Sequence, residues 1–143
     1  MDFEELYRLI RRFEGCRLRA YLCPAQVWTI GWGATGTEIG PGLVWSQAQA
    51  DARLERDAQK FARQTLALCP NLVDRSNQLS ALADFAYNLG IGNLRSSTLR
   101  KRVLNEDWLG ARQQLLRWVR GGGKVLRGLV LRRQAEAELL PWS

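Results

Sequence analysis

The chain has 143 residues, 46% of them hydrophobic and 24% charged, which is typical of a globular domain large enough to bury a core without disulfide or metal support. Its net charge of +7 favours an anionic partner or surface. It contains no histidine, which excludes histidine-ligated metal sites and every catalytic pair that depends on an imidazole base.

The N-terminus carries no recognisable export signal, because its first 15 residues begin with acidic side chains and lack an apolar core. The longest uncharged stretch, 20–37, is interrupted by Pro24 and several glycines, so it does not predict a membrane span. We therefore expect neither a signal peptide nor a membrane anchor in this chain.

The first predicted element is an amphipathic helix. Apolar residues recur at helical spacing through 3–13. Asp2 and Glu5 precede the apolar run with the spacing of a capping box, and Gly15 is a suitable residue to end the helix.

A small β region and a long helix follow. Residues 17–33 are rich in aromatic and β-branched side chains and indicate short strands with a turn at 24–26. Ser46 and Gln49 have the spacing of a second capping box, which opens a helix over 47–68. Only one face of that helix is apolar, a pattern typical of an element that bridges two lobes.

The second half of the chain is predicted to be helical. The segment 76–89 is apolar nearly all round apart from Asp84, which indicates a buried helix. Asp107 is placed to cap a later helix, glycines at 121–123 interrupt the pattern, and a last helix is expected over 129–139. The chain as a whole therefore predicts a mainly helical α+β fold.

One acidic residue is placed where it could act as a proton donor. Glu14 lies where the first helix meets Gly15, and the sequence TIGWG at 29–33 follows a short turn. A lone acid beside a strand and glycines suggests a cleft with a general acid at its edge. A glutamate at a helix end is, however, most often a solvated charge.

Several stretches of the sequence identify a family. They are EGCRLRAYLC, TIGWG, QLSALADFAYNLGIGN followed by SSTL, and WVRGGGKVLRGLVLRRQAE. Together they resemble the phage-type, T4-lysozyme-like endolysins of glycoside hydrolase family 24, and the similarity runs from about Phe3 to Leu139. The resemblance implies a peptidoglycan muramidase that hydrolyses the β-1,4 bond between N-acetylmuramic acid and N-acetylglucosamine and so lyses a bacterial host.

The resemblance also implies a domain organisation. Residues 1–143 would form a single lysozyme-like catalytic domain with a sugar-binding cleft between two lobes. The β lobe would cover about 14–45, the linking helix 46–68, and the helical lobe 70–143. Neither a cofactor nor a metal ion is expected for this chemistry.

Catalytic roles are carried over from the family motif by position. Glu14 would be the acid, while Cys23 and Thr29 would hold the attacking water, which places the chain in the subgroup with Cys in a Glu-Asp/Cys-Thr triad. Arg132 or Arg133 would orient Glu14, and the residues alone do not choose between them. The implied substrate-binding residues are Tyr21, Gly31, Gly33, Asn88, Asn93 and Ser97.

Two further positions depart from the family pattern. Gln26 occupies a place in the turn where many members have glycine, which predicts a turn of different shape. Ala34 stands where many members have histidine. Neither substitution changes a residue expected to take part in catalysis.

The cysteines allow two interpretations. Cys16 and Cys23 are seven residues apart, and a disulfide between them would sequester the thiol of the predicted triad until it is reduced. Alternatively, they are two separate packed thiols. Cys69 is expected to be a small buried residue.

Basic residues gather in the last third of the chain and suggest contact with an anionic membrane or lipopolysaccharide, as well as with peptidoglycan. No recognition motif supports binding of nucleic acid. Two alternatives to a muramidase remain, a peptidoglycan-binding homologue that has lost turnover and a cationic protein that disrupts membranes.

The resemblance also indicates how the protein is deployed. It would stay in the host cytoplasm until a holin opens the inner membrane, and it would then act on the periplasmic cell wall. We expect it to work as a monomer.

Overall fold

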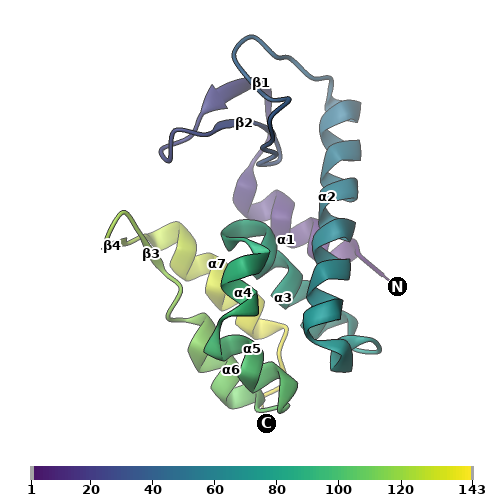
Figure 1. The fold of residues 1–143 in the computed structure, drawn as a ribbon, viewed down its shortest axis with the longest axis vertical. Coiled ribbons are helices and arrows are strands. Elements are labelled where there is room, and N and C mark those ends of the chain that lie inside the picture. The colour runs from purple at the N-terminus through teal and green to yellow at the C-terminus, as the bar shows by residue number, and fades with distance from the viewer. Residues whose placement is uncertain (1, 143) are drawn as a thin grey trace.

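The structure is a computed structural model that describes residues 2–142. It has a mainly helical α+β architecture with two lobes (Figure 1). The helices are α1 Glu4–Glu14, α2 Gln47–Leu68, the short 3-10 helix η1 Pro70–Leu72, α3 Ser76–Leu89, α4 Ile91–Arg95, α5 Thr98–Leu104, α6 Trp108–Leu115 and α7 Arg127–Glu138. The strands are β1 Arg17–Leu22, β2 Trp28–Gly31, β3 Arg120–Gly121 and β4 Lys124–Val125.

Helix α1 confirms the predicted amphipathic helix, although its capping differs in detail. The N-cap position is Phe3, and the Asp2 carboxylate accepts the backbone N–H of Glu4 at 2.9 Å. Glu5 pairs with Arg8 rather than completing a capping box. The helix ends at Glu14 because Gly15 leaves it with a φ of 65°, in the left-handed region.

The predicted β region is a two-stranded antiparallel sheet of β1 and β2, with a turn between them as expected. Ala20 and Ile30 of the sheet form a small buried cluster with Ala34 and Ile39 from the segment that follows β2. In Figure 1 this sheet lies above the helices, at one end of α2. A two-stranded sheet is not stable alone, so its position depends on packing against the helices.

Gln26 adopts a φ of 65°, in the left-handed region that favours glycine. The turn therefore has a backbone conformation that glycine would favour, and a difference in shape from the turns of glycine-bearing members stays a prediction. Replacing Gln26 by Gly should raise the free energy of unfolding by roughly 0.5–1 kcal/mol, because the strained side chain is removed. Urea unfolding measures this change. Ala25→Gly is the matched control and should lower stability, since Ala25 has no positive φ to relieve.

Helix α2 confirms the predicted span 47–68 and both halves of its capping box. The Ser46 hydroxyl accepts from the Gln49 backbone at 3.1 Å, and the Gln49 amide oxygen accepts from the Ser46 backbone at 2.8 Å. Its apolar stripe packs on α1 and α3, with Leu54 and Ala58 fully buried. Figure 1 shows α2 running from the sheet to the far end of the helical lobe.

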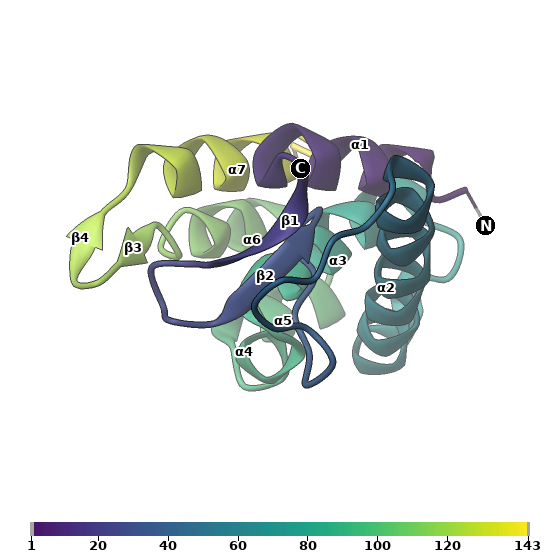
Figure 2. The ribbon, with the colours of Figure 1, turned by 90° about the horizontal axis from the view of Figure 1, so that it is seen from above.

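Helix α3 lies at the centre of the molecule, as its all-round apolar sequence predicts. Every side chain from Leu79 to Ala86 is buried, including that of Asp84. Phe85 and Leu82 of α3 belong to the main hydrophobic core, together with Leu99 of α5 and Leu115 of α6. Figure 2 shows α1, α2, α6 and α7 arranged around this helix.

The C-terminal region departs from the prediction at its glycines. The segment 121–123 was expected only to interrupt helices, but Gly121 ends strand β3, and Gly122 and Gly123 form the turn of the β3–β4 hairpin. Gly122 and Gly123 both have positive φ, which a tight hairpin turn requires. Figures 1 and 2 show this hairpin projecting from the start of α7, which begins at Arg127, two residues before the predicted 129.

Within residues 2–142, the helices are either too short or too polar to span a lipid bilayer.

Candidate active site

Glu14 is the last residue of α1, and it faces the chain that follows β2. Its side chain is 21% exposed. A Cβ atom built on Gly33 would lie 2.6 Å from the Glu14 Oε1 atom, closer than real contacts allow. Gly33 also has a φ of 85°. A side chain at position 33 would therefore strain the backbone and displace the Glu14 carboxyl group.

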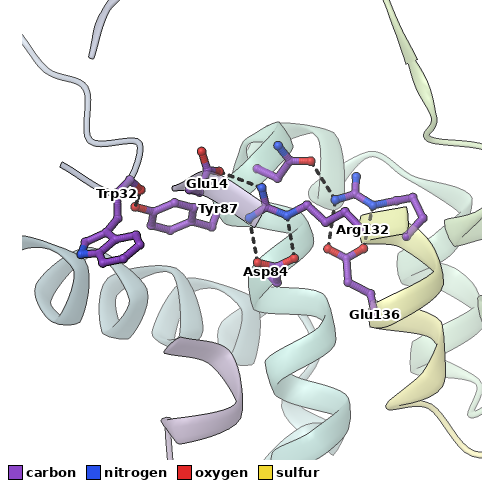
Figure 3. Close-up of polar contacts among 8 residues, drawn as sticks. Glu14, Trp32, Asp84, Tyr87, Arg132 and Glu136 are labelled. Carbon is purple, nitrogen blue, oxygen red and sulfur yellow. Dashed lines mark hydrogen bonds and ion pairs between the residues drawn. The ribbon is translucent and has the colours of Figure 1, made fainter. Parts of the chain in front are cut away.

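Arg132 holds Glu14 from the opposite side. Its Nη1 atom donates to Glu14 Oε2 at 2.8 Å, across 118 positions of sequence. Its Nε and Nη2 atoms donate to the two carboxylate oxygens of Asp84 at 2.9 and 2.8 Å. Figure 3 shows the guanidinium of Arg132 between the two carboxylates. Of the two arginines that the sequence left open, Arg132 is the one that contacts Glu14.

Arg133 serves a different pair of side chains. Its Nε atom lies 2.7 Å from Glu136 Oε1, and its Nη2 atom donates to the Asn88 amide oxygen at 2.7 Å. Arg133 and Glu136 are both completely buried. The two neighbouring arginines of α7 thus bind separate partners.

Burial and neighbouring charges shift the pKa values of the buried carboxyl groups of Asp84 and Glu136 in opposite directions. Burial raises the pKa of Glu136 well above its usual value, and hydrogen bonding to the adjacent Asp84 carboxylate adds to the effect. Burial also acts to raise the pKa of Asp84, but the charge of Arg132 outweighs it and the pKa is lowered. Asp84 is therefore the buried carboxyl group that carries the charge.

A cavity of about 360 Å³ opens beside Glu14. Glu14, Asn88 and Arg132 supply its polar lining, while Leu126 and Leu129 form part of an apolar wall. A cavity that combines an acid, an amide and apolar surface is suited to a sugar, which has polar edges and apolar faces. The predicted residues Glu14, Asn88 and Arg132 thus meet in one place.

Hydrogen bonds connect the neighbouring loop to the helices. The Tyr87 hydroxyl of α3 donates to the backbone oxygen of Trp32 at 2.6 Å. The indole of Trp32 donates to Asp51 of α2 at 2.8 Å. These contacts fix the segment that contains Gly33, and Figure 3 shows Tyr87 between Trp32 and Glu14.

Cys23 and Thr29 lie at the turn end of the sheet. The Cys23 N–H donates to the Val27 backbone oxygen at 3.0 Å, and the Thr29 hydroxyl donates to the same oxygen at 3.0 Å. A hydrogen bond from the Val27 backbone lowers the pKa of the Cys23 thiol, and the neighbouring Thr29 hydroxyl contributes to the shift. The turn thus favours a thiolate at Cys23.

Cys16 and Cys23 are separated by the whole of β1, and both are free thiols. Seven steps of extended chain place their Cα atoms roughly 20 Å apart. A disulfide needs Cα atoms within about 7 Å. The structure therefore contradicts the possible Cys16–Cys23 redox pair, because a strand holds its two ends apart.

The thiols should differ in reactivity. We expect iodoacetamide to modify Cys23 before Cys69, because the pKa of Cys23 is lowered while burial raises that of Cys69 to about 11. Peptide mass spectrometry of samples quenched over time would measure both rates. Denatured protein is the control, in which the two rates should converge; equal rates in the folded protein would contradict the expectation.

The other predicted binding residues do not line this cavity. The Ser97 hydroxyl is buried, donates to Leu94 O at 2.8 Å and accepts from Arg100 N at 3.0 Å, so it caps α5. Asn93 donates to Leu89 O at 2.6 Å. Substrate contact by these two residues stays a prediction.

Tyr21 and Gly31 belong to the sheet. Tyr21 pairs with Thr29 across the two strands, and the guanidinium of Arg17 lies over its ring at 4.6 Å. Gly31 faces the ring of Trp45, which a Cβ atom would meet at 3.0 Å. The close packing gives Gly31 a structural role, and sugar contact by either residue stays a prediction.

Sequence reasoning did not identify Asp84 and Glu136 as parts of the site. Asp84 did leave a signal, since it is the only charged residue in an otherwise uncharged helix segment. A buried charge is costly unless it is paired, so an isolated acid in a buried helix indicates a buried partner. Glu136 left no such signal, because α7 is rich in charges.

The model of one protein family, phage lysozyme, matches residues 11–136. The chain belongs to the phage lysozyme family. This lysozyme is 36% identical to a SAR-endolysin of Bacteriophage PS119 over 91% of its own length and 77% of that protein. It is 39% identical to an endolysin of Bacillus phage B103, where it spans 92% of its own length but only 50% of the relative.

A solved structure agrees with this assignment. The muramidase domain of SpmX from Asticaccaulis excentricus superposes with a TM-score of 0.84 at 30% identity, covering 95% of this chain and 94% of that one. The lysozyme described here is thus a glycoside hydrolase of the cell-wall-degrading class.

Proposed function

We propose that this lysozyme is an endolysin muramidase that cleaves the β-1,4 bond between N-acetylmuramic acid and N-acetylglucosamine in peptidoglycan. The supporting observation is the carboxyl group of Glu14, which faces the 360 Å³ cavity and is held by Arg132. A carboxyl group fixed at the edge of a sugar-sized cavity is what protonation of a glycosidic oxygen requires.

Glu14 donates its proton to the leaving oxygen of the sugar. Arg132 engages Oε2, which leaves Oε1 as the oxygen that donates. Asn88 lies at the same cavity and offers an amide to the sugar. The apolar side chains of Leu126 and Leu129 reduce the access of competing water on that side.

Cys23 and Thr29 act on the water that attacks the opposite face of the sugar. A lowered thiol pKa makes the Cys23 thiolate available as a base, which is the role of the aspartate found in other members. The chain thus falls in the Cys subgroup of glycoside hydrolase family 24. Tyr21, Gly31 and Gly33 supply the adjoining sugar contacts from the β lobe.

Replacing Cys23 by Ala should lower kcat by roughly tenfold to a hundredfold, because the base is lost and only Thr29 still holds the water. Cys23→Asp should keep activity within about tenfold of native, since a carboxylate can take the same role. Release of reducing ends from purified peptidoglycan measures both. Full activity in Cys23→Ala would assign the water to Thr29 or to solvent alone.

The biological setting follows from the same proposal. The lysozyme is made in the host cytoplasm, reaches the periplasmic wall when a holin opens the membrane, and acts as a monomer. The β3–β4 hairpin presents Lys124 and the exposed side chain of Val125. This combination favours transient contact with an anionic membrane or lipopolysaccharide near the wall.

The products of digestion test the proposed function. Purified sacculi treated with the enzyme should yield soluble fragments that end in a reducing N-acetylmuramic acid, as identified by mass spectrometry after borohydride reduction. Fragments that end in reducing N-acetylglucosamine would contradict the proposed bond. An absence of soluble fragments would contradict turnover itself.

A further inference from the structure

Asp84 is a charged side chain in the interior of the helical lobe. It lies in the middle of α3, is completely buried, and binds Arg132 through both carboxylate oxygens. Replacing such a pair by apolar side chains often leaves stability unchanged or raises it. Stability alone therefore does not explain why an aspartate occupies this position.

The catalytic acid offers a reason. A guanidinium beside a carboxyl group favours the ionised form of that group, whereas a general acid must begin the reaction protonated. Arg132 donates one N–H to Glu14 but two to Asp84. The carboxylate of Asp84 thus offsets most of the charge of Arg132 while it fixes the direction of the remaining N–H.

We propose that Asp84 is a positioning residue that balances the charge of Arg132, so that Arg132 orients Glu14 without holding it in the ionised form. This inference rests on the proposed role of Glu14 as the acid. It predicts that the charge of Asp84, and not only its shape, sets the pH range in which Glu14 can donate.

Few other titratable side chains lie beside Glu14 and Asp84. Tyr87 of α3 also faces Glu14, and burial together with the Glu14 charge raises the pKa of its hydroxyl, so it stays neutral. On α7, Arg133 and Glu136 adjoin Asp84: burial raises the pKa of Glu136, and the charge of Arg133 adds to that of Arg132 in lowering the pKa of Asp84. Arg132 is thus the cation that contacts Glu14 directly.

Asp84→Asn tests the charge with little change of shape. We expect kcat to fall by roughly tenfold to a hundredfold while KM changes by less than about threefold, because the acid and not the glycan site is affected. The basic limb of the pH–activity profile should move to lower pH by about one unit, since the uncompensated charge of Arg132 favours ionised Glu14. Assays are run at a temperature where circular dichroism shows each variant to be folded.

Asp57→Asn is the matched control. Asp57 is also a helical aspartate bound by an arginine, with Arg53 Nε donating to its Oδ2 atom at 2.8 Å, but it does not contact Arg132. It should lower thermal stability without moving the basic limb. An Asp84→Asn enzyme that is folded and retains the native kcat and the native basic limb overturns the proposal.

A double-mutant cycle shows whether Asp84 acts through Arg132. In an Arg132→Gln background, Asp84→Asn should have almost no additional effect on kcat. Additive losses would show that Asp84 acts by another route and would overturn the proposal. A loss confined to KM would do the same.

Carboxyl ¹³C NMR gives a readout without substrate. In the native protein, Asp84 should stay ionised throughout the pH range of activity, and a protonated Asp84 there overturns the proposal even if the variant does not fold. In Asp84→Asn, the titration of Glu14 should move to lower pH. If that shift is seen but native protein releases no glycan, the proposed function fails and the coupling between Asp84 and Glu14 stands.

Discussion

Glu14→Gln should lower the rate of peptidoglycan cleavage by roughly a hundredfold to ten-thousandfold, the range that a general acid contributes. In the native structure Arg132 donates to Glu14 Oε2 at 2.8 Å, and the amide of the variant keeps an oxygen that can accept this hydrogen bond. The amide has, however, no proton acidic enough to give to the leaving oxygen. The variant should therefore fold and bind sacculi while it fails to release reducing ends. Thermal unfolding and pelleting with sacculi check those two properties.

Glu5→Gln is the matched control for this change. Glu5 is on the same helix and makes an exposed ion pair with Arg8, far along α1 from the cavity. It should retain native activity. If Glu14→Gln also retains activity, Glu14 is not the acid and the chemistry belongs to another carboxyl group.

Arg132→Gln should lower the free energy of unfolding by about 3–5 kcal/mol at neutral pH, because it leaves the carboxylate of Asp84 buried without its cation. Only 4% of the Arg132 side chain is exposed, so solvent cannot replace the lost partner. Urea unfolding measures the loss. Arg56→Gln is the control, since Arg56 is 69% exposed in its ion pair and should change stability by less than about 1 kcal/mol.

The loss of unfolding free energy in Arg132→Gln should depend on pH in a definite direction. Arg132 lowers the pKa of Asp84 against the opposing effect of burial, so Asp84 stabilises the native fold above its unfolded-state pKa, and that contribution disappears as the pH falls through the lower folded-state value. The stability difference between native protein and Arg132→Gln should therefore narrow in acid. A difference that is constant from pH 7 to pH 3 would show that Asp84 is not ionised in the fold.

Local physics explains what the sequence predicted correctly. The span of α2 follows from the Ser46 and Gln49 capping box and from a proline after its last turn, and the burial of α3 follows from its uninterrupted apolar residues. These signals act within a few residues, so they can be read without knowing the fold. The candidate acid was likewise visible as a glutamate between a helix and a glycine.

Local sequence patterns could not predict which side chains contact each other in the fold. The Ser97 hydroxyl caps α5, a role that its sequence context did not indicate. Cys16 and Cys23 looked close in sequence, yet β1 holds them apart. The β3–β4 hairpin was missed because two-residue strands carry too short a pattern to recognise.

The sequence by itself determined the longer helices α1, α2 and α3, the proposed acid and, through its motifs, the phage lysozyme family. Only the tertiary structure decided that Arg132 rather than Arg133 holds Glu14, and that Asp84 lies behind it. Adjacent arginines on a helix point in different directions, about 100° apart around its axis, so the packing of α7 against α1 and α3 selects one of them. That choice joins residues 118 positions apart, a distance at which periodicity carries no information.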